Sequence, residues 1–316
     1  MLKARDKLMP YIQYKTKRFS AESKRRINQV NDIILDYQEQ GFDLTLRQLY
    51  YQLVSKDLIP NTQKSYKTLG TLVSDARLAG LIDWSMIQDR TRNLRRNPHW
   101  NSPKDIVSAC ADQYQIDHWV GQKFRPEVWI EKEALAGVIE GVCNELDVAY
   151  FSCRGYTSQS EMWRAAQRLK TNYDDDGQVT YIIHLGDHDP SGLDMSRDIE
   201  DRLTMFLTRD LELFENEEPD FIFDRVALNT DQIEAYSPPP NPAKITDSRA
   251  GAYIARFGQS SWELDALEPR VLIKLIRDTI EWLREDVPYE ARINKQKKEK
   301  GQLKTIVQNW EGICNA

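Results

Sequence analysis

The sequence predicts an α/β protein in which a helical N-terminal part precedes a parallel sheet with helices on both faces. Apolar residues recur at helical spacing along residues 21–80, whereas beyond residue 125 short β-type runs alternate with helical stretches. The clearest run is Val179–Leu185, which stops at Gly186 and is followed by the segment DHDPSG, residues 187–192, which we call the acidic turn. Strands that alternate with helices form parallel sheets with right-handed crossovers. A chain of 316 residues is long enough for about two domains.

The composition is typical of a globular protein and excludes a membrane or disulfide-rich class. It is 41% hydrophobic and 29% charged. The sequence has no apolar run of about 18 residues and no cleavable leader, so we expect a cytoplasmic protein without membrane contact. The four cysteines show no CxxC pairing and no metal-ligand spacing with the four histidines, and we expect reduced thiols.

Charge is distributed unevenly along the chain. Residues 1–100 contain 18 Lys and Arg against 10 Asp and Glu, a balance of +8. The remainder contains 25 against 39, a balance of −14, and the whole chain has a net charge of −6. A basic module joined to an acidic one fits phosphate binding by the first and metal binding by the second. Scattered surface charge is the alternative.

Three helices and a short strand are expected in the N-terminal part. A basic arm over residues 1–20 precedes them. Apolar spacing and capping residues predict helices over 21–40, 46–55 and 62–80, and a strand over 81–87. This order resembles a winged helix-turn-helix, so we expect residues 21–100 to form a DNA-binding domain.

The helix over 46–55 contains a candidate nucleophile. At about 100° per residue Tyr50 falls on the apolar face, whereas Tyr51 falls beside Arg47 on another side. We therefore expect Tyr50 in the core and Tyr51 exposed. A guanidinium close to a phenol favours the phenolate and can hold a phosphate oxygen, so Tyr51 and Arg47 are candidate catalytic residues. Simple packing is the alternative.

Arginines are concentrated in the segment DRTRNLRRNPHW, residues 89–100. We expect Arg90, Arg92, Arg95 and Arg96 to contact DNA phosphates, because the segment directly follows the expected wing. A solvated linker is the alternative. Residues 101–124 show no clear period, and we expect them to connect the two domains.

The α/β domain is expected over residues 125–316, with a helical region at its end. The expected strands cover residues 127–131, 148–152, 179–185 and 224–228. The proline-rich segment 237–249 is expected to be a solvated surface loop. We expect Glu263 and Asp265 to be helix caps rather than ligands.

Three carboxylates are expected at the carboxyl edge of this sheet. Asp187 and Asp189 follow the third strand and stand on the same side of an extended segment, whereas His188 points the other way. Glu131 ends the first strand at the same edge, where ligands bind in open α/β sheets. Oxygen ligands favour Mg²⁺, with Mn²⁺ as a possible substitute. The alternative is that Glu131 and Asp187 cap the helices that follow them and that Asp189 is a solvated turn residue.

Three motifs resemble those of a known family. A strand ending in glutamate, a βαβα segment and a strand ending in DxD resemble the Toprim domain of topoisomerases and primases. The run DHDPSG is similar to the DxDPxG of topoisomerase VI A subunits and the related meiotic double-strand-break proteins. IEKEA is similar to their glutamate motif, and LRQLYY to the motif that carries their nucleophile. The resemblance implies a winged helix followed by a Toprim-type domain, from about Thr45 onward.

Two differences from the family pattern suggest a divergent, compact, stand-alone member. The loop CRGYT matches the family's glycine-containing loop only loosely, and Ser191 stands where relatives often have a larger residue.

The resemblance also implies an activity, that of the cleavage subunit of a type II DNA topoisomerase. Tyr51 would attack a DNA phosphorus and stay linked to a 5′ end, with Arg47 steadying the phosphate. Glu131, Asp187 and Asp189 would hold Mg²⁺. A double-strand cut would need a two-fold homodimer on duplex DNA, in which the tyrosine of one chain meets the metal of the other. The sequence has no glycine-rich nucleotide loop, so ATP-driven strand passage would need a separate ATPase B-type subunit.

Two other functions fit the same residues. One is a Toprim nuclease in which metal-activated water attacks the DNA and Tyr51 is structural. The other is a non-catalytic DNA-binding subunit whose acidic site is idle.

Overall fold

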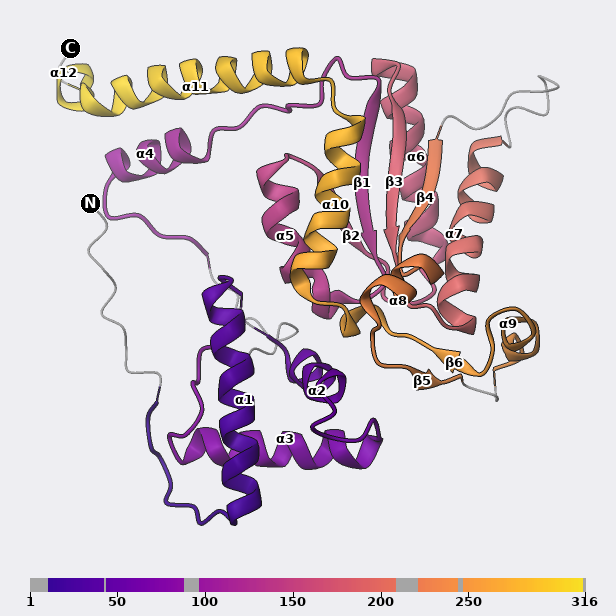
Figure 1. Cartoon of the computed structure of the whole chain (residues 1–316). Coiled ribbons are helices and arrows are strands. Elements are labelled where there is room, and N and C mark those ends of the chain that lie inside the picture. The colour runs from indigo at the N-terminus through magenta and orange to yellow at the C-terminus, as the bar shows by residue number, and fades with distance from the viewer. Residues whose placement is uncertain (1–10, 43, 88–96, 209–220, 244–246, 315–316) are drawn as a thin grey trace.

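The computed structural model of the chain describes residues 11–42, 44–87, 97–208, 221–243 and 247–314. It confirms the α/β class, with a helical N-terminal part next to a four-stranded parallel sheet (Figure 1).

The three predicted N-terminal helices are present. They are α1 (Ala21–Glu39), α2 (Leu46–Ser55) and α3 (Gln63–Leu78). Ser20 and Thr62 cap α1 and α3, and Thr45 forms the expected capping box with Gln48 at the start of α2. One apolar core joins the three helices, because their apolar residues follow the helical spacing seen in the sequence.

The strand expected over residues 81–87 is not formed, and this prediction was wrong. Ile87 makes a single bridge with Leu44, and the rest of the segment bends. Asp83 explains the bend, because its Oδ1 accepts a hydrogen bond from the backbone N–H of Ser85 (2.7 Å). The described end of the N-terminal arm is held by backbone bonds from Tyr14 and Lys15 to the carbonyl of Leu78.

The expected connector contains a helix that the sequence did not predict, α4 (Pro103–Gln113). Its partner is the long helix α11 (Asp286–Gln308). Polar contacts tie the two segments together: the Tyr114 hydroxyl donates to Glu299 (2.6 Å), and the N–H of Ile116 donates to Gln296 (2.8 Å). Because α4 has little buried apolar surface, no helical period marks it in the sequence.

The sheet is parallel throughout, as predicted, in the order β2-β1-β3-β4. Its strands are β1 (Phe124–Ile130), β2 (Ala149–Ser152), β3 (Val179–Leu185) and β4 (Phe221–Ala227). Central β1 and β3 are buried on both faces, which explains their nearly continuous apolar sequences.

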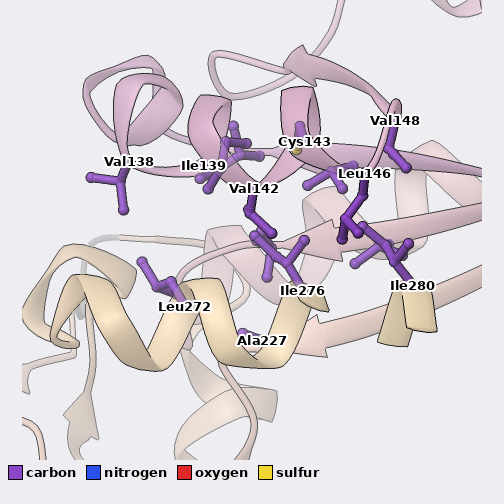
Figure 2. Close-up of a cluster of buried hydrophobic side chains, with 14 of the residues drawn as sticks. Val138, Ile139, Val142, Cys143, Leu146, Val148, Ala227, Leu272, Ile276 and Ile280 are labelled. Carbon is purple, nitrogen blue, oxygen red and sulfur yellow. The ribbon is translucent and has the colours of Figure 1, made fainter. Parts of the chain in front are cut away.

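Helices cover both faces of the sheet, as the alternating pattern predicted. The helices α5 (Ala136–Glu145) and α10 (Pro269–Leu283) pack on one face, and α6 (Gln159–Asp176) and α7 (Pro190–Thr208) pack on the other. Figure 2 shows the first of these contacts, where Val142 of α5 and Ile276 of α10 meet near Ala227 of β4.

A short 3-10 helix, η1 (Glu133–Leu135), precedes α5. The other described elements lie beyond β4: α8 (Thr230–Tyr236), β5 (Asn241–Pro242), α9 (Ala250–Phe257), β6 (Ser260–Ser261), the 3-10 helix η3 (Leu264–Ala266) and α12 (Trp310–Cys314).

The proline-rich segment is not a solvated loop, and this prediction was wrong in its described part. Pro238 and Pro239 are buried, and β5 pairs with β6 in an antiparallel ladder. Asn61, just before α3, donates a hydrogen bond to the carbonyl of Pro240 (3.0 Å). The segment therefore packs against the N-terminal helices instead of extending into water.

All four cysteines are free, as expected. Among the described helices, none combines the length and apolar character that crossing a bilayer requires.

The contact between α5 and α10 predicts a stability difference between two identical substitutions. Ile276 is fully buried, so Ile276→Ala should lower the free energy of unfolding by about 2–5 kcal/mol through lost burial and a residual cavity. Ile306 on α11 is 44% exposed, and Ile306→Ala should change the free energy by no more than about 0.5 kcal/mol. Urea unfolding of both variants measures the difference, and equal effects would contradict this packing.

Candidate functional site

Glu131 and Asp187 come together at the carboxyl edge of the sheet. β1 leads through α5 to β2 on one side, whereas β3 leads through α7 to β4 on the other, so neighbouring β1 and β3 form the topological switch point. Glu131 directly follows β1 and Asp187 follows β3. The Glu131 carboxylate accepts a hydrogen bond from the backbone N–H of Asp187 (2.9 Å). The sequence predicted this juxtaposition correctly.

The carboxylate of Asp187 is buried and faces two donor groups. Its Oδ1 accepts the N–H of Leu264 (2.7 Å) and lies 2.9 Å from the Lys132 ammonium. Burial raises the pKa of Asp187 to about 7, and nearby Glu131 adds to the increase while Lys132 opposes it. Burial also raises the pKa of Glu131, against the effect of its hydrogen bond from the Asp187 N–H.

Asp189 caps a helix. Its Oδ1 accepts hydrogen bonds from the backbone N–H of Gly192 (2.7 Å) and the hydroxyl of Ser191 (2.9 Å), at the start of α7. The sequence alternative gave the cap to Asp187 and made Asp189 a solvated turn residue, and it was wrong for Asp189, which is buried and itself caps α7. The charge of Asp189 helps to raise the pKa of Glu131.

His188 points away from the two aspartates, as predicted. Its Nδ1 lies 2.8 Å from the Tyr253 hydroxyl. Its backbone exchanges two hydrogen bonds with Trp262, which follows β6 (2.8 and 2.9 Å). The segment after β6 thus holds the acidic turn in place.

Glu263 and Asp265 take part in an ion cluster, so the prediction that they are helix caps was wrong. Neither side chain caps η3. The Lys132 ammonium lies 2.7 Å from Glu263 Oε2 and 3.0 Å from Asp265 Oδ1, and Arg47 forms ion pairs with both acids. The charges of Lys132 and Arg47 outweigh the opposing effect of burial and lower the pKa of Glu263 to about 2.

Tyr51 is 4% exposed, so the prediction of an exposed phenol was wrong. η3 and β5 pack over α2, and the Tyr51 hydroxyl accepts a hydrogen bond from Asn241 (3.4 Å) and donates one to Glu263. Burial and the Glu263 charge raise the pKa of the Tyr51 phenol above its ordinary value. The predicted partner Arg47 is in place, with its guanidinium 5.7 Å from the Tyr51 ring centre.

Tyr50 belongs to the apolar core, as predicted. Its hydroxyl donates to Asn61 Oδ1 (2.9 Å) on the side of α3. Adjacent tyrosines therefore face different surroundings: Tyr50 faces α3, and Tyr51 faces the ion cluster.

Arg225 is a partly buried cation that the sequence gave no reason to select. From β4 it donates to the carbonyls of Asp187 (2.6 Å) and Gly186 (3.1 Å), and it also contacts Ser196 of α7. Its charge counters those of Glu131, Asp187 and Asp189. Arg225 thus fixes the acidic turn from the side of β4.

We call the following eight described side chains the edge cluster: Glu131, Asp187, Asp189, Glu263, Asp265, Arg47, Lys132 and Arg225. Five carboxylates stand against three cations, so the cluster has a formal charge of −2 when every group is ionised. Carboxylate oxygens that carry an excess of negative charge fit a hard divalent cation such as Mg²⁺.

The acids are not arranged as a preformed metal site. Among the described residues, no group of three or more His, Cys, Asp or Glu side chains has a metal-binding arrangement. N–H groups and Lys132 use several of the oxygens that a metal would need. The metal role of Glu131, Asp187 and Asp189 therefore stays a prediction. Arg90, Arg92, Arg95 and Arg96 lie outside the described residues.

Sequence reasoning missed Lys132, Glu263, Asp265, Arg225 and Asn241. Two signals were available: Lys132 directly follows Glu131, and WELDAL contains a second pair of acids two residues apart. Neither motif says which strand edge it meets, because the contact joins residues about 130 positions apart. No local pattern marks Arg225 or Asn241.

No protein-family model matches the sequence, and no curated protein is similar enough to count as a match.

The acidic turn predicts a strict requirement for glycine at position 192. A Cβ there would lie 2.2 Å from the carbonyl oxygen of Asp187, far inside contact distance. Gly192→Ala should therefore displace the turn and lower the free energy of unfolding by more than about 2 kcal/mol.

The matched control is Gly141→Ala in α5, where a Cβ would meet nothing within 4 Å. This variant should be neutral or stabilised by up to about 1 kcal/mol. Urea unfolding compares the two, and a Gly192→Ala variant as stable as the unmodified chain would contradict the geometry of the turn.

Proposed function

We propose that this chain is a divalent-metal-dependent enzyme that cleaves duplex DNA by tyrosine transesterification, similar to the A subunit of topoisomerase VI. In this proposal residues 21–100 are a DNA-binding domain built on three helices, and the parallel sheet is a Toprim-type domain. The observation that carries the proposal is that one network of contacts joins Tyr51 of α2 to Asp187 at the switch point of the sheet.

The network crosses from the helical part to the sheet in three steps. The Tyr51 hydroxyl bonds to Glu263. The Glu263 carboxylate pairs with Lys132 (2.7 Å), and Lys132 pairs with Asp187 (2.9 Å). Tyr51 of the helical part therefore lies within a few side chains of the acids in the sheet of its own chain, whereas the family resemblance implied a tyrosine that meets the metal of the partner chain.

The proposed chemistry is a phosphodiester exchange. The Tyr51 hydroxyl loses its proton, and its oxygen forms a bond to phosphorus while the bond from phosphorus to the 3′ oxygen breaks. The 3′ oxygen leaves as a hydroxyl after taking up a proton, and the 5′ phosphate stays on the tyrosine. Attack by the same hydroxyl reverses the step. Arg47, next to the Tyr51 ring, would steady the phosphate.

Glu131, Asp187 and Asp189 would hold Mg²⁺, or Mn²⁺ in its place. Bound there, the ion supplies positive charge for the phosphate oxygens during the exchange. The excess of carboxylates over cations in the edge cluster supports this assignment.

Access to the nucleophile requires a movement of the chain. Tyr51 is 4% exposed and lies beneath Asn241 and η3. DNA can reach the hydroxyl only when the segment with Asn241 moves away. A double-strand cut requires two tyrosines, so we propose a two-fold homodimer on duplex DNA, with a separate ATPase subunit where strand passage is driven by ATP.

The burial of Tyr51 also favours a second candidate, a Toprim-type nuclease in which water attacks the phosphate. Burial and Glu263 raise the pKa of the phenol, which disfavours the phenolate needed for attack. In that case Tyr51 only holds α2 against β5.

The two candidates differ in the fate of the tyrosine. With labelled duplex and Mg²⁺, the unmodified chain should form a protein–DNA adduct on a denaturing gel, and Tyr51→Phe should form none because the attacking oxygen is gone. Tyr50→Phe is the matched control, since it removes the hydroxyl of an equally buried tyrosine that bonds to Asn61 and should keep the adduct.

Cleavage by Tyr51→Phe that leaves free 5′ phosphates would favour the nuclease. An adduct that persists in Tyr51→Phe would reject Tyr51 as the nucleophile in either scheme.

The metal assignment predicts a second difference. Asp187→Asn should lower Mg²⁺-dependent cleavage by roughly a hundredfold or more, because it removes a proposed ligand at the reacting phosphate. Asp194→Asn on nearby α7 should keep most of the activity, since Asp194 pairs with Arg249 outside the edge cluster. Initial cleavage rates at graded Mg²⁺ test this, and equal rates for the two variants would argue against the assignment.

A further inference from the structure

Lys132 lies at the centre of three carboxylates. Its ammonium is 2.9 Å from Asp187 Oδ1, 2.7 Å from Glu263 Oε2 and 3.0 Å from Asp265 Oδ1. The ammonium donates hydrogen bonds to Glu263 and Asp265 and forms an ion pair with Asp187. A compact cation surrounded by carboxylate oxygens occupies the kind of position that a metal ion takes.

The position is enclosed. The Lys132 side chain is 16% exposed, and that of Asp265 is 1% exposed. Asp265 Oδ2 has no hydrogen bond, although Arg47 Nε lies 2.8 Å away. A carboxylate as deeply buried as Asp265 needs a cation close by, and without Lys132 the three acids would repel one another.

The backbone separates this position from the proposed metal position. Lys132 has an extended conformation (φ −103°, ψ 114°), in which neighbouring side chains point in opposite directions. Glu131 therefore turns to the N–H of Asp187, whereas Lys132 turns to η3. Asp187 contacts Glu131 through its backbone N–H and Lys132 through its carboxylate. As a proposed metal ligand, Asp187 would share that carboxylate between the two cation positions.

Two cation positions that share a carboxylate are the arrangement of two-metal sites, in which the ions lie about 3.5–4 Å apart. We propose that Lys132 is a built-in cation that fills the second of these positions, so that the site takes one divalent ion per chain. Lys132 is then a positioning residue: it holds Asp187 toward the metal and Glu263 toward Tyr51. The inference rests on the divalent-cation site of the proposed function.

The proposal predicts that removal of the ammonium creates a new metal position. Lys132→Met keeps an unbranched side chain of nearly the same length, without the ammonium, and leaves Asp187, Glu263 and Asp265 without their cation. The variant should bind one more Mn²⁺ per chain than the unmodified protein, two instead of one. The number of bound ions is counted by electron paramagnetic resonance of the free Mn²⁺ during a titration of the full chain.

Two controls separate this effect from a general change of charge. Lys123→Met makes the same substitution at an exposed lysine and should leave the number at one. The double variant Lys132→Met with Glu263→Gln should lose the added ion, because one of its ligands is gone. Circular dichroism without metal reports whether each variant is folded.

Glu263→Gln alone decides the question if Lys132→Met does not fold. It keeps Lys132 and two of its acceptors, so one Mn²⁺ should still bind as in the unmodified chain. Loss of that ion would place Glu263 in the primary metal site and overturn the proposal.

The outcomes distinguish this inference from the proposed function. One ion in both the unmodified chain and Lys132→Met would overturn the role of Lys132 and leave the metal site intact. No ion in the unmodified chain but one in Lys132→Met would support the role of Lys132 and reject the primary site. Two ions in the unmodified chain, or none in either protein, would overturn the inference.

Discussion

The structure depends on how buried carboxylates at one edge of the sheet are compensated. The switch point brings Glu131 and Asp187 together, and the segment after β6 adds Glu263 and Asp265. Arg47, Lys132 and Arg225 balance them, each from a different element. Carboxylates that are held close together and partly removed from water are strongly unfavourable unless a cation lies beside them. The compensating cations therefore hold α2, β1 and β4 in fixed relation to the acidic turn.

The same compensation joins the two parts of the chain. Arg47 reaches from α2 to Glu263 and Asp265, and Ala266 of η3 packs into the core of the N-terminal helices. Tyr51 lies directly beneath this contact, which explains why it is buried although its helix position alone favours exposure. In this arrangement the phenol is kept protonated and covered, so a cleavage reaction would begin with the opening of the contact.

Sequence patterns predicted most of the fold, because helices and strands are set by local periodicity and capping. The run Val179–Leu185 is a strand with the expected bounds, and Thr45 and Gln48 form the expected capping box. They also placed Glu131 beside Asp187, since parallel strands end at one edge. They could not predict the burial of Tyr51 or the roles of Lys132 and Glu263, which depend on contacts between residues far apart in the chain. The helix α4 was missed because its packing is largely polar.

The central claim is that the acids at the switch point share one divalent ion next to a protein ammonium. The most direct measurement is the anomalous X-ray signal of crystals soaked in Mn²⁺. The account predicts one peak within ligand distance of Glu131, Asp187 and Asp189, with the Lys132 side chain still between Asp187 and Glu263. A peak at the position of the Lys132 ammonium, or no peak at this edge of the sheet, would contradict it.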